Sequence, residues 1–176
     1  DRPAMLRRQQ MKPQPTRWSS RRNSALFLNV DGVLNVVDSI FSVSSCGRPE
    51  QLQLVRLAKV MQLGCFLVLT SPWRLDERYC GRLASALVRC GIQWAPQAIS
   101  VTPDGRGHGT SQVEERLMEI GAWIESNPWL QQWAIVDCLD LLSVDATIHE
   151  QFVRTDPTRG LLDEHVEELS ELFANE

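Results

Sequence analysis

The sequence predicts an α/β fold, a doubly wound, Rossmann-like three-layer sandwich around a mainly parallel sheet. Two observations lead to this prediction. Short apolar runs at 25–30, 65–69 and 133–136 have the length and composition of strands that are buried on both faces. Stretches with apolar residues at helical spacing separate these runs. Alternating strands and helices are typical of a parallel sheet that is covered by helices.

The remaining elements follow from local signals along the chain. Helices are expected at 49–64, 76–89, 111–126 and 163–173, and short strands at 97–101 and 152–153. Pro49 and Asp163 begin helical patterns, and Ser111 or Thr110 is the expected N-cap of the helix between them at 111–126. Gly64 and Gly91 follow two of the helices, where glycine commonly ends a helix.

The chain is long enough for one domain with a sizeable core. Of its 176 residues, 43% are hydrophobic and 23% are charged, which is ordinary for a globular protein. No apolar run approaches the roughly 18 residues of a membrane-spanning helix. The five cysteines lack C-x-x-C spacing, so neither a zinc site nor a disulfide framework is expected.

The charge of the chain is unevenly distributed. The net charge is -4, yet residues 1–24 carry seven basic residues and one acidic residue, which leaves -10 for residues 25–176. Residues 1–24 also contain three prolines and little apolar periodicity. We therefore divide the chain into an extended basic N-terminal arm, 1–24, and a folded domain, 25–176.

The basic arm is predicted to bind a partner. The candidate residues are Arg7, Arg8, Arg17, Trp18, Arg21 and Arg22. Other protein subunits of a large complex, bound through an acidic groove, are the expected partner, and RNA phosphates are the alternative. Arg-rich, Ser-containing and acid-poor N-terminal segments resemble organelle import signals, so a mitochondrial location is expected.

Polar side chains stand at the ends of three predicted strands. Asn29 and Asp31 end the first strand, Thr70 and Ser71 follow the second, and Asp137 follows the third. Doubly wound sheets bind ligands beyond the carboxyl ends of their strands. We therefore expect these residues to converge on one edge of the sheet and to form the candidate site.

The motifs at these strand ends resemble those of the haloacid dehalogenase (HAD) superfamily of phosphohydrolases, and most closely its small-cap group with the HAD domains of RNA-repair proteins. The family's first motif, Asp-x-Asp, is NVD here. Its first position, the nucleophile and a magnesium ligand, is Asn29, and its second, the general acid and base, is Asp31. Thr70–Arg74, TSPWR, resembles the second motif, which grips the phosphoryl group. The resemblance covers about residues 25–174 and implies a minimal cap.

The third and fourth motifs complete the resemblance and add a second departure from it. Arg116, with Arg106 as a second candidate, matches the residue that neutralises phosphate. The fourth motif reads IVDCLD, in which Asp137 is retained and Cys138 replaces the second metal-binding acid. Asp140 is a further acid close to this motif.

These departures are unfavourable for hydrolysis by the family's route. An aspartyl-phosphate intermediate requires an anionic oxygen, whereas an amide oxygen is neutral. Magnesium prefers oxygen ligands that include carboxylates, and Asn29 and Cys138 together remove up to two of these charges. No cofactor is therefore expected, and Mg²⁺ would bind through Asn29 and Asp137 only if the site were active. An Asp→Asn change made to trap a substrate would explain residue 29 but not Cys138.

The retained residues also have structural interpretations. Asp31 is expected to accept backbone hydrogen bonds in the turn after the strand, and Asp137 to be a hydrogen-bonded turn residue. Arg116 is expected on a solvated helix face or in a pair with Glu119. For Thr70, phosphate binding and helix capping are equal alternatives.

The favoured function is that of a catalytically degenerate HAD-like domain. Such a domain would be a structural or accessory subunit of a larger, mitochondrial assembly, docked through the basic arm. The first alternative is a magnesium-dependent phosphatase that acts on a macromolecular phosphate such as a nucleic-acid end, because a minimal cap leaves the site open. The second is an RNA-binding module that uses the remnant pocket without chemistry. The fold alone does not decide among them.

Overall fold

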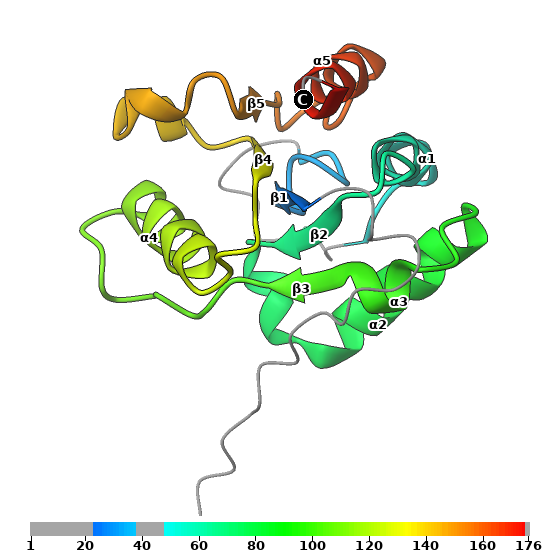
Figure 1. Ribbon diagram of the computed structural model, residues 1–176, viewed down its shortest axis with the longest axis horizontal. Helices are drawn as coiled ribbons and strands as arrows, with labels where there is room; N and C mark the ends of the chain where they lie inside the picture. The colour runs from blue at the N-terminus through cyan, green and yellow to red at the C-terminus, as the bar shows by residue number, and fades with distance from the viewer. Residues whose placement is uncertain (1–22, 38–47, 175–176) are drawn as a thin grey trace, which may run out of the picture.

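The computed structural model describes residues 23–37 and 48–174, and within them it confirms the predicted α/β class. The strands are β1 (Ser24–Leu28), β2 (Phe66–Leu69), β3 (Ile99–Val101), β4 (Gln132–Asp137) and β5 (Phe152–Arg154). They form one sheet in the order β3-β2-β1-β4-β5, and all neighbouring pairs are parallel (Figure 1).

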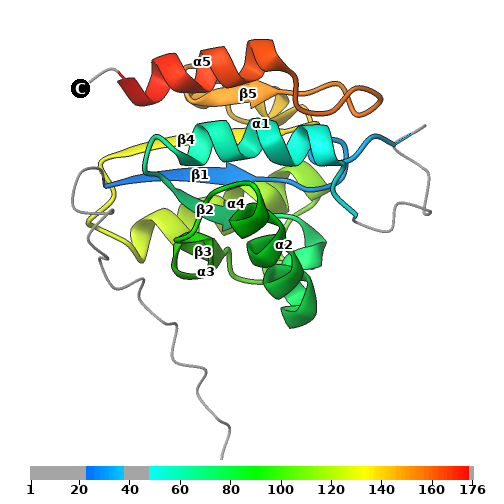
Figure 2. The ribbon, with the colours of Figure 1, turned by 90° about the vertical axis from the view of Figure 1, so that its right-hand side faces the viewer.

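Helices cover both faces of this sheet and complete a three-layer sandwich. The helices are α1 (Gln51–Met61), α2 (Glu77–Arg89), α3 (Ala95–Ala98), α4 (Gln112–Glu125) and α5 (Asp163–Ala174). Short 3₁₀ helices are η2 (Pro72–Leu75), η3 (Leu141–Ser143) and η4 (Ala146–Ile148). Figures 1 and 2 show α1, α2 and α5 on one face of the sheet and α4 on the other.

The central strands are buried because nearly all of their side chains are apolar. Every residue of β1 and β2 is buried, and so are the last four residues of β4. β1 lies between β2 and β4, so that Leu26 pairs with Leu67 on one side and with Ala134 on the other. Side chains on both faces of these strands pack against the helices and form one continuous core.

Two elements differ from their predicted boundaries. The first strand ends at Leu28 rather than at Val30, because the backbone N–H groups of Val33 and Leu34 both donate to the Val30 carbonyl and close a turn. The strand predicted at 97–101 begins only at residue 99, because α3 precedes it. Pro96 stands in the first turn of α3, a position that proline favours.

Two further expectations concern a membrane-spanning helix and a cap domain. No helix in the described part is both long and apolar enough to cross a lipid bilayer. The connections described at the carboxyl edge of the sheet contain no separate cap domain. Residues 38–47, which lie between β1 and α1, are outside the described ranges.

We predict that Gly160→Ala destabilises the domain more than Gly64→Ala does. Both glycines have positive φ, +67° and +94°, so both changes carry the backbone strain of an L-residue, about 1 kcal/mol or more. A Cβ at residue 160 would also lie 2.9 Å from the Val33 carbonyl oxygen, whereas one at residue 64 would meet nothing within 4 Å. Urea unfolding should show an additional loss of about 1–3 kcal/mol for Gly160→Ala. Equal losses would contradict the assigned contact.

Candidate functional site

The polar residues that were predicted to converge do lie together at the carboxyl edge of the sheet. From β1 the chain continues to β2 on one side of this strand, and it later returns to place β4 on the other side. Doubly wound α/β folds bind ligands at the point where the strand order switches in this way. Asn29 follows β1, Thr70 follows β2, and Asp137 is the last residue of β4. Hydrogen bonds join Asn29 to Asp137 directly, and Thr70 to Asp137 through Arg116.

Asn29 presents its amide nitrogen to this site. Nδ2 donates to the backbone carbonyl of Asp31 at 2.8 Å and to Asp137 Oδ1 at 3.1 Å, and it lies 3.7 Å from Cys138 Sγ. A backbone carbonyl and a carboxylate only accept hydrogen bonds, so these partners determine the orientation of the amide. Residue 29, at the nucleophile position, therefore turns a hydrogen-bond donor, its Nδ2 group, toward Asp137.

Both carboxylate oxygens of Asp31 accept hydrogen bonds from side chains. Asn35 Nδ2 donates to Oδ1 and Trp73 Nε1 donates to Oδ2, each at 2.8 Å. Asn35 Oδ1 in turn accepts from the backbone N–H of Gly32 at 3.0 Å. Asp31 thus stabilises the turn after β1, and its donors are side chains rather than the backbone N–H groups expected from the sequence.

Arg116 is buried, so the expectation of a solvated helix face or a pair with Glu119 was wrong. Only 4% of Arg116 is exposed, and its Nη1 forms an ion pair with Asp137 Oδ2. The same nitrogen donates to Thr70 Oγ1 at 3.3 Å. Asp137 is fully buried, and its other oxygen also accepts from the Leu139 N–H at 3.0 Å. A desolvated carboxylate needs a compensating cation, and α4 supplies it.

Glu119 pairs instead with Arg74, whose importance the sequence analysis missed. Arg74 Nη2 and Glu119 Oε1 lie 2.6 Å apart, and both side chains are almost completely buried. The other bonds of the Arg74 guanidinium go to the backbone carbonyls of Thr70, Ser71, Thr102 and Pro103. Burial lowers the pKa of Arg74 from its ordinary value, and the Glu119 charge opposes this shift. Arg74 therefore fixes the loops that follow β2 and β3.

Cys138 is a neutral thiol at the fourth-motif position. Burial, reinforced by the negative charge of Asp137, raises the pKa of Cys138 to about 11. Its Sγ donates to the backbone carbonyl of Asp31 at 3.4 Å. Asp140 pairs with Arg154 at 3.3 Å, and half of its side chain is exposed, so it contributes no carboxylate to this cluster.

The other sequence candidates lie elsewhere. Arg106 is exposed and pairs with Asp104 at 2.9 Å, which leaves Arg116 as the arginine of the site. Ser71 Oγ accepts a backbone hydrogen bond and caps η2. The partner-binding residues proposed for the basic arm all fall within 1–22, outside the described residues.

Comparison with known families classifies this arrangement. The family described as "HAD domain in Swiss Army Knife RNA repair proteins" matches residues 25–166, which is most of the chain. The chain belongs to this HAD family. Neither the search of curated proteins nor that of solved structures found a match. The resemblance drawn from the strand-end motifs is thereby confirmed.

The residues of this HAD domain do not fit magnesium, the metal that the resemblance implies. Magnesium prefers several oxygen ligands, carboxylates among them. Both oxygens of Asp137 and both oxygens of Asp31 already accept hydrogen bonds, and Asn29 directs an N–H group toward Asp137. Within 23–37 and 48–174, no three His, Cys, Asp or Glu residues are grouped in a way that could hold a metal ion. The counter-charge for Asp137 is the Arg116 guanidinium.

We predict that Arg116→Met lowers the free energy of unfolding of the HAD domain by about 3–5 kcal/mol, because it leaves the Asp137 carboxylate buried and unpaired. Chemical denaturation measures the change. Arg116→Met/Asp137→Asn should recover part of the loss, since it removes the unpaired charge. Arg154→Met, which breaks a half-exposed pair, is the matched control and should change stability little. Similar losses for Arg116→Met and Arg154→Met would contradict the buried pair.

Proposed function

We propose that this HAD domain has lost phosphoryl-transfer chemistry and acts as a structural or accessory module of a larger assembly. The observation that carries the proposal is the orientation of Asn29, whose Nδ2 donates to Asp137 at 3.1 Å. The family's route begins with attack on phosphorus by a carboxylate oxygen. A neutral amide whose N–H group is bonded to the neighbouring carboxylate offers no such nucleophile.

The charges around Asn29 support the same proposal. Arg116, the candidate for phosphate neutralisation, is paired with Asp137. A thiol is ordinarily protonated at neutral pH, and burial raises the pKa of Cys138 further, to about 11, so it supplies no anion to the site. An incoming phosphate would have to compete with Asp137 for Arg116 in a buried environment, where breaking an ion pair is costly.

A magnesium-dependent phosphatase for a nucleic-acid end is the second candidate. It is favoured by the convergence of Thr70, Arg116 and Asp137 on one edge of the sheet, together with Asp31 on the turn beside them. It also suits a family of RNA-repair proteins. This candidate requires another nucleophile in place of Asn29 and a rearrangement that frees carboxylate oxygens for the metal.

We predict that the unmodified protein does not hydrolyse p-nitrophenyl phosphate in the presence of Mg²⁺, and that about 10 mM Mg²⁺ does not raise its melting temperature. Asn29→Asp alone should lower the melting temperature, because a carboxylate oxygen would face Asp137 at close range. Asn29→Asp/Cys138→Asp should show a melting temperature that rises with Mg²⁺, since two carboxylates are restored beside Asp137. Metal-dependent turnover by the unmodified protein would establish the phosphatase instead.

Docking through the basic arm and location in the mitochondrion are further parts of the proposal. They rest on the seven basic residues of the N-terminal segment. Acidic grooves of other protein subunits suit such a segment, and so do RNA phosphates. Ser24 belongs to β1, and the Asn23 carbonyl accepts from the backbone N–H groups of Gln131 and Gln132. A truncation that leaves the domain intact should therefore end at residue 22.

We predict that deleting residues 1–22 abolishes incorporation into the assembly without unfolding the domain. Affinity purification of the tagged protein from mitochondria, followed by mass spectrometry, measures incorporation, and urea unfolding of the truncated chain provides the control. Removal of the positive charges should eliminate the attraction to an acidic partner. An unchanged set of co-purifying proteins would exclude docking by the arm.

A further inference from the structure

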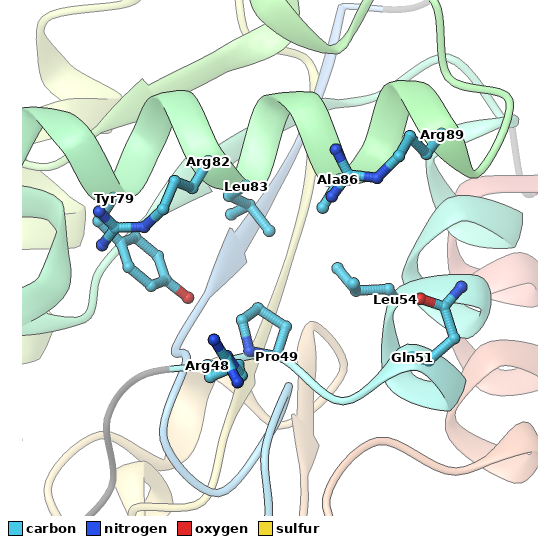
Figure 3. Close-up of a pocket in the computed structure, with 9 residues that line it drawn as sticks. All are labelled: Arg48, Pro49, Gln51, Leu54, Tyr79, Arg82, Leu83, Ala86 and Arg89. Carbon is cyan, nitrogen blue, oxygen red and sulfur yellow. The ribbon is translucent and has the colours of Figure 1, made fainter.

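A second feature of the domain lies outside the remnant site, in a cavity of about 700 Å³ between α1 and α2. Figure 3 shows Arg82 and Arg89 on α2 across the cavity from Arg48 and Gln51, which stand at the beginning of α1. Among the residues that the structure describes, nine line the cavity, and they include three arginines and neither aspartate nor glutamate. A concave surface with this charge is suited to an anionic ligand.

The arginines of the cavity have charge available for a ligand. Within the described residues, Arg48 and Arg89 form no ion pair. Arg82 has only a 3.7 Å contact with Asp76, and its side chain is 64% exposed. Two guanidinium groups that have no acidic partner in the described part of the chain, and one weakly paired group, therefore border the same hollow.

Local contacts orient this charge. The Arg82 guanidinium carbon lies 5.9 Å from the centroid of the Tyr79 ring, a cation–π distance, and Figure 3 shows the two side chains together at one end of the cavity. On the opposite side, the N-cap of α1, Glu50, forms no side-chain capping bond, and its carboxylate accepts from the Val36 N–H. The Glu50 carboxylate lies at the N-terminus of α1 and offsets the positive end of this helix, so the charge that favours an anion comes from the three arginines.

The spacing of the arginines favours a chain of phosphates over a single anion. Arg82 and Arg89 are seven residues apart on α2, which places them on nearly the same face and about 10 Å apart along the axis. Their side chains extend along the cavity in Figure 3 and do not converge on one point. The cavity also adjoins the remnant site, because Tyr79 stacks on Trp73 at 5.6 Å and Trp73 donates to Asp31.

We infer that this cavity, with Arg48, Arg82 and Arg89, is a binding groove for the phosphodiester backbone of single-stranded RNA. The phosphate chemistry is common to RNA and single-stranded DNA, and the family of RNA-repair proteins favours RNA. The groove requires no chemistry at Asn29, so the inference goes beyond the proposed function and holds whether or not the remnant site is active.

Fluorescence anisotropy of the full chain tests the groove with a fluorescein-labelled single-stranded RNA of about 12 nucleotides that carries no terminal phosphate. Arg82→Gln/Arg89→Gln should weaken binding about tenfold or more. It should also reduce the slope of log K against log salt by about 1.4, about 0.7 for each phosphate that an arginine no longer neutralises. Both arginines are exposed, so the variant should fold, and circular dichroism checks this.

Arg106→Gln/Arg154→Gln is the matched control, since it removes the same formal charge from exposed arginines outside the cavity. It should bind RNA nearly as the unmodified protein does. Equal weakening by both double variants, or no RNA binding by the unmodified protein, would overturn the groove.

Two further ligands test whether the groove binds DNA or an acidic protein surface in place of RNA. DNA of the same sequence should bind more weakly than the RNA, and equal or tighter binding of DNA would overturn the assignment to RNA. Binding of labelled poly-glutamate in place of RNA would identify an acidic protein surface as the partner and would also overturn it. The probe contains no phosphomonoester, so an active phosphatase would contradict the proposed function without affecting this test.

Discussion

The burial of Asp137 is the constraint on which the arrangement of the site depends. Its carboxylate stands at the end of strand β4, next to the central strand β1, with no exposed surface, and the folded domain must compensate this charge. Arg116 provides the compensation from α4, the helix that precedes β4 in the chain. Thr70 and Asn29 then complete the hydrogen bonds of the pair. An interior ion pair has therefore become part of the core at the position where this fold binds ligands.

Both departures from the family pattern suit this internal pair. A second carboxylate at residue 29 or 138 would repel Asp137 unless a metal ion lay between them. With the Arg116 guanidinium as the counter-charge, a neutral amide and a neutral thiol are the favourable neighbours. Asn29 contributes a donor to Asp137, and Cys138 contributes a thiol that stays protonated. The amide of Asn29 and the thiol of Cys138 thus suit the same electrostatic environment.

The sequence was sufficient to predict the fold and the convergence of the site, because both follow from local patterns. Apolar runs identified the strands, and parallel strands bring Asn29, Thr70 and Asp137 to one edge. Partners across the fold were not predictable in the same way. Helical spacing offered Glu119 as one alternative partner of Arg116, whereas its observed partner lies 21 residues away on β4.

The same limitation applies to Arg74 and to the groove. In TSPWR, Arg74 follows a polar turn and has no local sign of burial, yet Glu119 and loops from two strands surround it. The groove lies between α1 and α2, and its arginines, Arg48, Arg82 and Arg89, are widely separated in the sequence. Sequence spacing therefore does not show that they border one cavity. Distances through space, rather than residue spacing, determine both features.

The guanidinium of Arg74 has a consequence for how relatives of this domain are classified. All of its hydrogen-bonding directions are used by backbone carbonyls and by Glu119, so replacing it would disturb folding before it affected any ligand. Natural selection for a stable chain is enough to retain such a residue through divergence. An intact TSPWR-like signature in a relative is therefore a sign of this stabilising contact and is not by itself a sign of turnover.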